Sequence, residues 1–203
     1  MIIRKGLGAV VFMLFFIFLA VNGHAYIIDF EGLADLTPVT DQYIGFDLTF
    51  SNATAITAGI SLNQIEIPPR SGSNVVYDNG GPIIINFSVP VSNAGGYFTY
   101  YTNITLTAYD SSNNLIATVP SSFSANYVGA GIGTPWEFLQ VASAGGISRI
   151  EIAGHPSGGS FTLDDFTDTP PSTAVPEPTT ILFLSLGSGL LAVARSRLMK
   201  KKS

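Results

Sequence analysis

Acidic residues stand near both ends of the central part of the sequence, where folding can bring them together. Asp29 and Glu31 lie close to its start, and Asp164 and Asp165 lie close to its end. If the first and last strands of a β-sandwich pair, these carboxylates cluster, and they repel one another unless a cation joins them. Calcium takes about six to eight oxygen ligands, so the four residues form a predicted structural Ca²⁺ site. The alternative is that they are solvated edge-strand residues that discourage aggregation.

A group of tyrosines has the spacing of one strand face. Tyr97, Thr99 and Tyr101 alternate along a predicted strand, and Tyr109 is expected on a neighbouring strand, facing the same way. Exposed aromatic rings stack on flat ligands, so Tyr97, Tyr101 and Tyr109 are the candidate carbohydrate contacts. The alternative is that these rings only stabilise the sheet across strands.

Few residues support catalysis. The chain has no cysteine, which excludes disulfides, thiolate catalysis and cysteine-ligated zinc. His155 is the only histidine outside the first 25 residues, and no nucleophile motif accompanies it. We therefore predict no catalytic residues. A glycosidase needs only two carboxylates, about 5–10 Å apart, so a secreted carbohydrate-active enzyme is the alternative.

The net charge of the central part of the sequence limits the classes of molecule that it can bind. Residues 26–175 contain thirteen acids against two bases, Arg70 and Arg149, which gives a net charge of −11. A surface this acidic repels phosphate backbones and argues against nucleic acid as a partner. It is compatible with divalent cations and with neutral sugars.

Residues 26–169 must form the domain that positions these side chains. With 46% hydrophobic residues, 21 glycines and 12 prolines, the composition favours a turn-rich all-β domain. Leu106 and Ala108 share one strand face opposite Thr107, and Trp136 is expected in the core. We expect an antiparallel jelly-roll or galactose-binding-like β-sandwich. Its predicted strands are 26–30, 43–50, 54–60, 63–67, 74–77, 83–89, 96–101, 104–109, 114–119, 123–128, 136–141, 147–153 and 160–167.

Residues 1–25 have the organisation of a secretory signal peptide. Arg4 and Lys5 precede an apolar run, and Gly23 and Ala25 put small residues where signal peptidase cuts. We expect cleavage after Ala25 and export of the domain that follows. The alternative is an uncleaved membrane anchor.

A second apolar segment lies near the C-terminus. Residues 179–194 carry no charge, and as a helix they would be about 24 Å long, slightly short of a ~30 Å hydrocarbon core. We expect a transmembrane helix here, after a Pro/Ser/Thr linker at 170–174. The tail 195–203 should stay in the cytoplasm under the positive-inside rule. Its basic residues are Arg195, Arg197, Lys200, Lys201 and Lys202.

A short proline motif precedes the predicted helix. Val175, Pro176, Glu177 and Pro178 form an extended, accessible segment, because proline fixes φ and discourages helix. Residues 175–203 contain, in order, this motif, the predicted helix and the basic tail. This order resembles the PEP-CTERM sorting signal of exopolysaccharide-producing Gram-negative bacteria. That signal is also labelled the "ice-binding protein C-terminal domain", a label that does not itself show ice binding. The alternative is an ordinary tail anchor whose proline motif is only a linker.

The resemblance implies a route and a destination for the protein. In the PEP-CTERM family the membrane protease exosortase recognises the signal and is thought to cleave near the Pro-Glu-Pro. We therefore expect a non-enzymatic protein that is first membrane-anchored and then lies at the cell surface or in the extracellular matrix. Its sandwich is expected to contact extracellular polysaccharide, with Ca²⁺ as a structural ion. A purely structural matrix component is a further alternative.

Overall fold

The computed structural model describes residues 26–131 and 135–169, which belong to one compact unit of the chain. The predicted signal peptide at 1–25, the linker, the proline motif, the helix at 179–194 and the basic tail lie outside the described residues. Among the described residues no helix is long and apolar enough to span a membrane.

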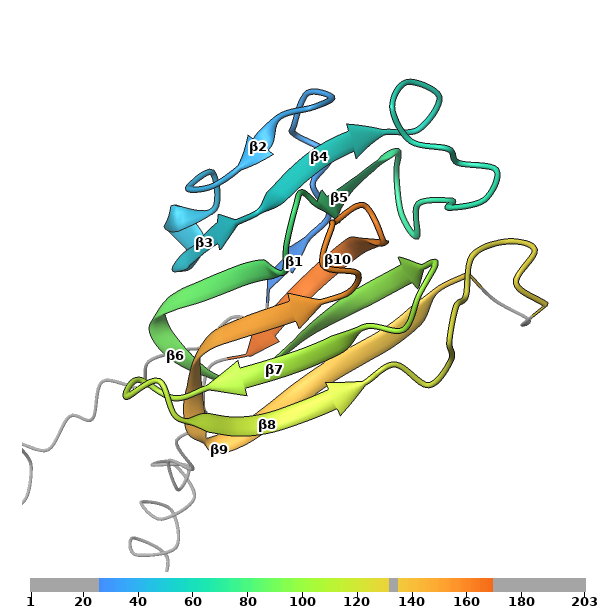
Figure 1. Ribbon diagram of the computed structural model, residues 1–203. Coiled ribbons are helices and arrows are strands. Elements are labelled where there is room, and N and C mark those ends of the chain that lie inside the picture. Colours follow the sequence, from blue (N-terminus) through green and yellow to red (C-terminus); the bar gives the residue numbers. More distant parts are fainter. Residues whose placement is uncertain (1–25, 132–134, 170–203) are drawn as a thin grey trace, which may run out of the picture. The chain divides into compact units, whose positions relative to one another are not determined.

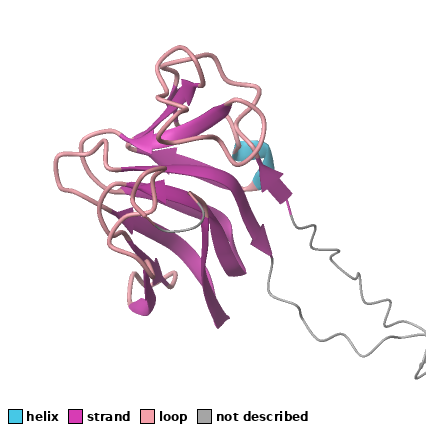
Figure 2. Cartoon of the chain, turned by 90° about the vertical axis from the view of Figure 1, so that its right-hand side faces the viewer, coloured by secondary structure: helices cyan, strands magenta, loops and turns pink. Residues whose placement is uncertain are grey.

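Antiparallel strands make up nearly all of the regular structure, as the alternating sequence pattern predicts (Figure 1). Figure 2 shows one helical turn, η1, in cyan among the described residues. The elements are β1 (Tyr26–Ile28), β2 (Pro38–Val39), η1 (Ile44–Phe46), β3 (Leu48–Ser51), β4 (Ala53–Thr57), β5 (Asn74–Asp78), β6 (Ile83–Tyr100), β7 (Thr105–Tyr109), β8 (Leu115–Pro120), β9 (Glu137–Ala153) and β10 (Phe161–Thr169).

Two long strands, β6 and β9, pass from one layer of the domain to the other. The register of β6 shifts around Val91, next to Pro90, and β9 contains Gly146 with φ +88°. Proline cannot donate to a ladder and glycine tolerates positive φ, so both strands can bend at these points. The bends are visible at the left of Figure 1.

The bends divide one continuous sheet into two layers. The first layer is β3, the first half of β6, the second half of β9, β7 and β8. The second layer is the first half of β9, the second half of β6, β10, β5, β4 and β2. The all-β antiparallel sandwich is therefore confirmed, while its finer assignment as jelly-roll or galactose-binding-like stays a prediction.

The core lies between the layers. Phe98 and Tyr100 of the second layer and Leu106 of the first are fully buried. Phe50 on β3 and Phe166 on β10 bring rings from the two layers to 6.1 Å. Side chains on the opposite face of each strand therefore point away from the core, because successive residues of a strand alternate between faces.

Several predicted boundaries were wrong. The predicted strands 83–89 and 96–101 are parts of β6, and 136–141 and 147–153 are parts of β9. Residues 63–67 and 123–128 are loops. Pro68 and Pro69 follow the first of these segments, where the amide of Ile67 bonds back to the carbonyl of Asn63 in a turn.

The pairing of the first and last strands is confirmed. β1 runs antiparallel to β10, with Ile28 opposite Phe166 and Tyr26 opposite Asp168. This pairing brings the chain after Ile28 beside the bulge of β10, where the predicted acidic residues lie.

Candidate functional site

The outer surface of the second layer carries a row of aromatic side chains. Tyr97 and Tyr101 point outward from β6 and its end, as the alternation predicts, since Phe98 and Tyr100 between them are buried. Phe138 on β9 stands opposite Tyr97, with ring centroids 5.1 Å apart. Phe138 is 43% exposed, so part of this aromatic surface is open to solvent.

Trp136 belongs to the same surface. It lies outside the buried core clusters of the described domain, so its expected core position is wrong. Its indole N–H donates to the carbonyl of Pro68 at 2.9 Å, which ties the loop before β5 to the start of β9. We call Tyr97, Tyr101, Trp136 and Phe138 the aromatic face.

Arg70 lies on the aromatic face. Its guanidinium carbon is 4.8 Å from the ring centroid of Tyr97 and 5.9 Å from that of Trp136. A guanidinium over a ring face is attracted by the quadrupole of the ring. The contact places a cation beside a flat apolar surface.

The predicted calcium ligands of β10 hold the backbone of this same loop. Asp164 Oδ2 accepts the amide N–H groups of Arg70 at 2.7 Å and Ser71 at 3.0 Å. Asp165 Oδ1 accepts the hydroxyl of Ser71 at 2.7 Å. Asp165 has φ +46° at the bulge of β10, which explains how two successive carboxylates reach one segment.

Glu31 holds the next residues of the loop. Its Oε1 accepts the amide N–H groups of Ser73 at 2.8 Å and Asn74 at 2.7 Å. Gly72 lies between Ser71, which contacts Asp164 and Asp165, and Ser73, which contacts Glu31. Its φ is +51°, and a Cβ there would be 2.2 Å from the Glu31 carboxyl carbon. The fourth predicted ligand, Asp29, is exposed, and its Oδ1 accepts the amide N–H of Glu31.

The fold thus brings Glu31, Asp164 and Asp165 to one loop, as predicted, and each carboxylate has protein donors there. Within residues 26–131 and 135–169, no three His, Asp or Glu side chains are grouped so that they could hold a metal. The calcium ion itself stays a prediction. Burial raises the pKa of Asp164 to about 6, which favours the protonated acid where no cation is present.

The predicted position of Tyr109 is wrong. Tyr109 is on β7, and its partner on β9 is Arg149, in the first layer. Leu106 and Ala108 of β7 are buried, so Tyr109 points outward on the opposite side of the sandwich from Tyr97. The sequence could not show this, because β9 carries the sheet from one layer to the other.

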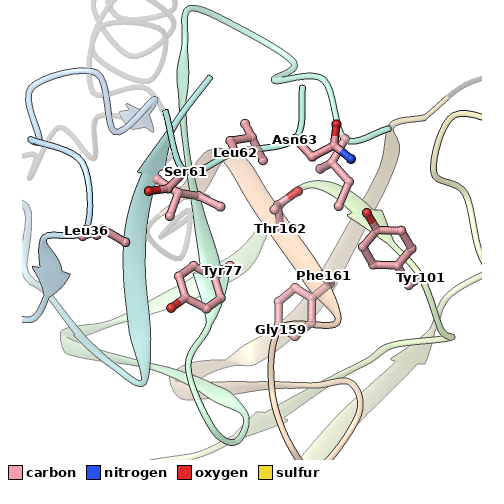
Figure 3. Close-up of a pocket in the computed structure, with 11 residues that line it drawn as sticks. Leu36, Ser61, Leu62, Asn63, Tyr77, Tyr101, Gly159, Phe161 and Thr162 are labelled. Carbon is pink, nitrogen blue, oxygen red and sulfur yellow. The ribbon is translucent and has the colours of Figure 1, made fainter. Parts of the chain in front are cut away.

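A hollow of about 290 Å³ borders the aromatic face at Tyr101. Figure 3 shows Tyr77 at the left and Tyr101 at the right, with Thr162 between them and with Leu62 and Asn63 above. The Tyr101 hydroxyl donates to Glu66 at 2.9 Å, and burial together with Glu66 raises the pKa of Tyr101 to about 12. The phenol is therefore neutral at physiological pH.

Sequence reasoning missed two features of the site. Arg70 gave one signal, since it is one of two bases in residues 26–175. Tyr77 and the loop residues of the hollow gave no signal in the sequence, because their neighbours come from distant parts of the chain.

His155 is exposed in a turn, where its Nδ1 accepts the amide N–H of Ser157.

The C-terminal part of the sequence matches the family described as the PEP-CTERM protein-sorting motif, over residues 174–198. This confirms the expected PEP-CTERM sorting signal and indicates an exported, exosortase-processed surface protein. No curated protein matches the chain.

Several solved structures are similar to the chain. A cleaved adhesin domain of Lys-gingipain has 12% identity and a TM-score of 0.48, and the match covers 72% of this chain and 99% of that domain. A second such domain, from Porphyromonas gingivalis, has 12% identity and a TM-score of 0.44, covering 73% and 99%. A CBM35 domain from Paenibacillus barcinonensis has 17% identity and a TM-score of 0.37, covering 72% and 98%.

Proposed function

We propose that this exported protein binds extracellular polysaccharide through the aromatic face. The observation that carries the proposal is the set of partly exposed rings on the second layer, with Tyr97 and Phe138 5.1 Å apart and Arg70 over Tyr97. Tyr97 and Phe138 stand on two paired strands, so these two rings are held by the sheet rather than by a free loop.

Such a face suits a sugar chain for physical reasons. Aromatic rings offer large flat apolar areas, and each loses little conformational freedom on binding. Polar groups at the border of the face, such as the exposed amide of Asn63 in the hollow, can fix the orientation of a sugar ring. The proposal predicts binding without turnover.

The sorting signal supplies the place where this binding occurs. In the proposed route, signal peptidase cleaves after Ala25, the segment 179–194 anchors the protein in the membrane, and exosortase then cuts near Pro176–Pro178. The domain would then lie at the surface or in the matrix of a Gram-negative cell, where exopolysaccharide is abundant.

The test measures binding of the full-length chain, purified in detergent, to exopolysaccharide isolated from the producing cells. Tyr97→Ala and Phe138→Ala should each lower the affinity about three- to tenfold, because each removes a stacking ring. Tyr109→Ala is the matched control, since it removes a ring from the opposite side of the sandwich.

Two outcomes would contradict the proposal. Equal losses in Tyr97→Ala and Tyr109→Ala would show that binding does not depend on the aromatic face. Release of new reducing ends by the wild-type chain, abolished by a single Asp or Glu substitution, would favour the alternative of a carbohydrate-active enzyme.

A further inference from the structure

The two arginines of the described domain have different surroundings. The Arg149 guanidinium lies 3.7 Å from the ring centroid of Tyr109 and donates to Glu151 at 3.2 Å and to Asn113 at 2.7 Å. The Arg70 guanidinium also lies over a ring, but in the described part of the chain it has no ion pair and no hydrogen-bond acceptor. Arg70 is exposed, so these donors face solvent.

The acidic residues around Arg70 are engaged elsewhere. Asp164 and Asp165 accept backbone and hydroxyl groups of the loop itself. Glu66, in the same loop between β4 and β5, accepts the hydroxyl of Tyr101. Among the described residues, none of these three acids forms an ion pair with Arg70.

The position of Arg70 is fixed by both its backbone and its side chain. Asp164, 3% exposed, accepts the Arg70 amide, and two residues earlier the Pro68 carbonyl accepts the indole of Trp136. The guanidinium lies over the Tyr97 ring. A guanidinium carries its N–H donors in one plane, and two of them match the two oxygens of a carboxylate.

We propose that Arg70 binds the carboxylate of an acidic sugar, so that the polysaccharide recognised by the aromatic face contains uronic acid residues. This inference rests on the proposed function and adds the chemical class of the ligand. In the bound state one sugar ring stacks on the aromatic face, and its carboxylate accepts two N–H groups of Arg70. The pair is charge-assisted and bidentate, which is the strong form of such a contact.

The net charge of the domain does not oppose this contact strongly. The charge of −11 over residues 26–175 repels a polyanion at long range, but at physiological ionic strength charges are screened beyond about 8 Å. The contact with Arg70 is made at hydrogen-bond distance and is screened much less.

The test compares two polymers that differ in one group. Polygalacturonate and the galactan made from it by carboxyl reduction have the same rings, and the full-length chain is titrated with each in about 0.15 M salt. The wild-type chain should bind polygalacturonate about tenfold more tightly than the reduced polymer. Arg70→Gln should remove this preference, so that it lowers the affinity for polygalacturonate about tenfold more than the affinity for the reduced polymer.

Two further variants sharpen the result. Arg149→Gln is the matched control, since that arginine also stacks on a tyrosine but already has its acceptors, and its preference should equal that of the wild type. Arg70→Lys should keep only part of the preference, because an ammonium group cannot form the bidentate pair. Unchanged melting temperatures would show that the Arg70 variants are folded.

The outcomes separate this inference from the proposed function. If the wild-type chain binds both polymers equally, or if Arg70→Gln keeps the preference, the role of Arg70 is refuted while the aromatic face stands. If the wild-type chain binds neither polymer but binds the isolated exopolysaccharide through Tyr97, the uronic acid assignment is refuted. If it binds none of the three, the proposed function fails as well.

Discussion

Stability should increase as the pH falls from 7.5 to 5.0, because burial raises the pKa of three carboxyl groups in the folded protein, and for two of them the raised value lies within this range. Burial raises the pKa of Asp164 to about 6, and burial together with the charge of Asp47 raises the pKa of Asp168 to about 6. In an unfolded chain an aspartic acid has a pKa of about 3.9. The folded state therefore binds protons more tightly. The resulting stabilisation is complete below about pH 3.9 and is lost as the pH rises through about 6.

The size of the effect follows from these pKa values. Between pH 7.5 and 5.0 each of the two groups takes up most of a proton in the folded state and little in the unfolded state, which contributes about 1 kcal/mol per group. Two groups give about 2 kcal/mol, or roughly 5 °C in melting temperature for a domain of this size. Protonation also reduces the repulsion within a domain of net charge −11, which acts in the same direction.

The measurement is a series of thermal melts of the full-length chain in EDTA-containing buffers from pH 5.0 to 7.5. Asp164→Asn should remove about half of the pH dependence, although it also lowers stability at every pH because the amide replaces one acceptor oxygen. Asp110→Asn is the control. Hydrogen bonds from Asn114 lower the pKa of Asp110, so it does not titrate in this window.

A melting temperature at pH 7.5 that equals or exceeds the melting temperature at pH 5.0 would refute this reasoning. The calcium prediction gives a separate result in the same experiment. If Glu31 and Asp164 hold Ca²⁺, the ion keeps both carboxylates charged, and replacing EDTA by millimolar Ca²⁺ raises the melting temperature at pH 7.5. No change on this replacement would refute the structural ion.

Three other perturbations test the loop, the core and the sorting signal. Gly72→Ala should destabilise the domain by about 1–3 kcal/mol in urea melts, because φ is +51° and the new Cβ would lie 2.2 Å from the Glu31 carboxyl carbon. An unchanged urea midpoint would contradict the close approach of Gly72 to Glu31. Asp78→Ala should cost about 3 kcal/mol by the same measurement, since the fully buried Asp78 accepts the amide and hydroxyl of Ser160; a loss under 1 kcal/mol would show that the contact is dispensable. Alanines at 176–178 should abolish the size change of the protein in its host, and normal processing would show that exosortase does not read this motif.

The alternation of side chains could be predicted wherever a strand is buried on one face. Phe98 and Tyr100 face the core while Tyr97 and Tyr101 face outward, and Leu106 and Ala108 face the core opposite the threonines of β7. These assignments depend only on neighbouring residues, and a period of two is visible within five or six of them.

The layer in which each strand lies could not be predicted in this way. β6 and β9 each run through both layers, and the bends at Pro90 and Gly146 look in sequence like turns that end a strand. The local pattern therefore predicts two separate strands in place of each long one, and it predicts that Tyr109 faces the same way as Tyr97. Local patterns show which face of a strand is buried, but not on which side of the core that strand lies.

The acidic residues show how a correct juxtaposition can support more than one chemistry. Pairing of β1 with β10 brings Glu31 to the loop that Asp164 and Asp165 also contact. Their oxygens, however, accept N–H and O–H groups of one loop, and loop segments that donate to carboxylates leave no trace in sequence spacing. The same contacts hold Arg70 over Tyr97. Asp164 and Asp165 therefore fix the loop that carries Arg70, the arginine that has no ion pair in the described residues.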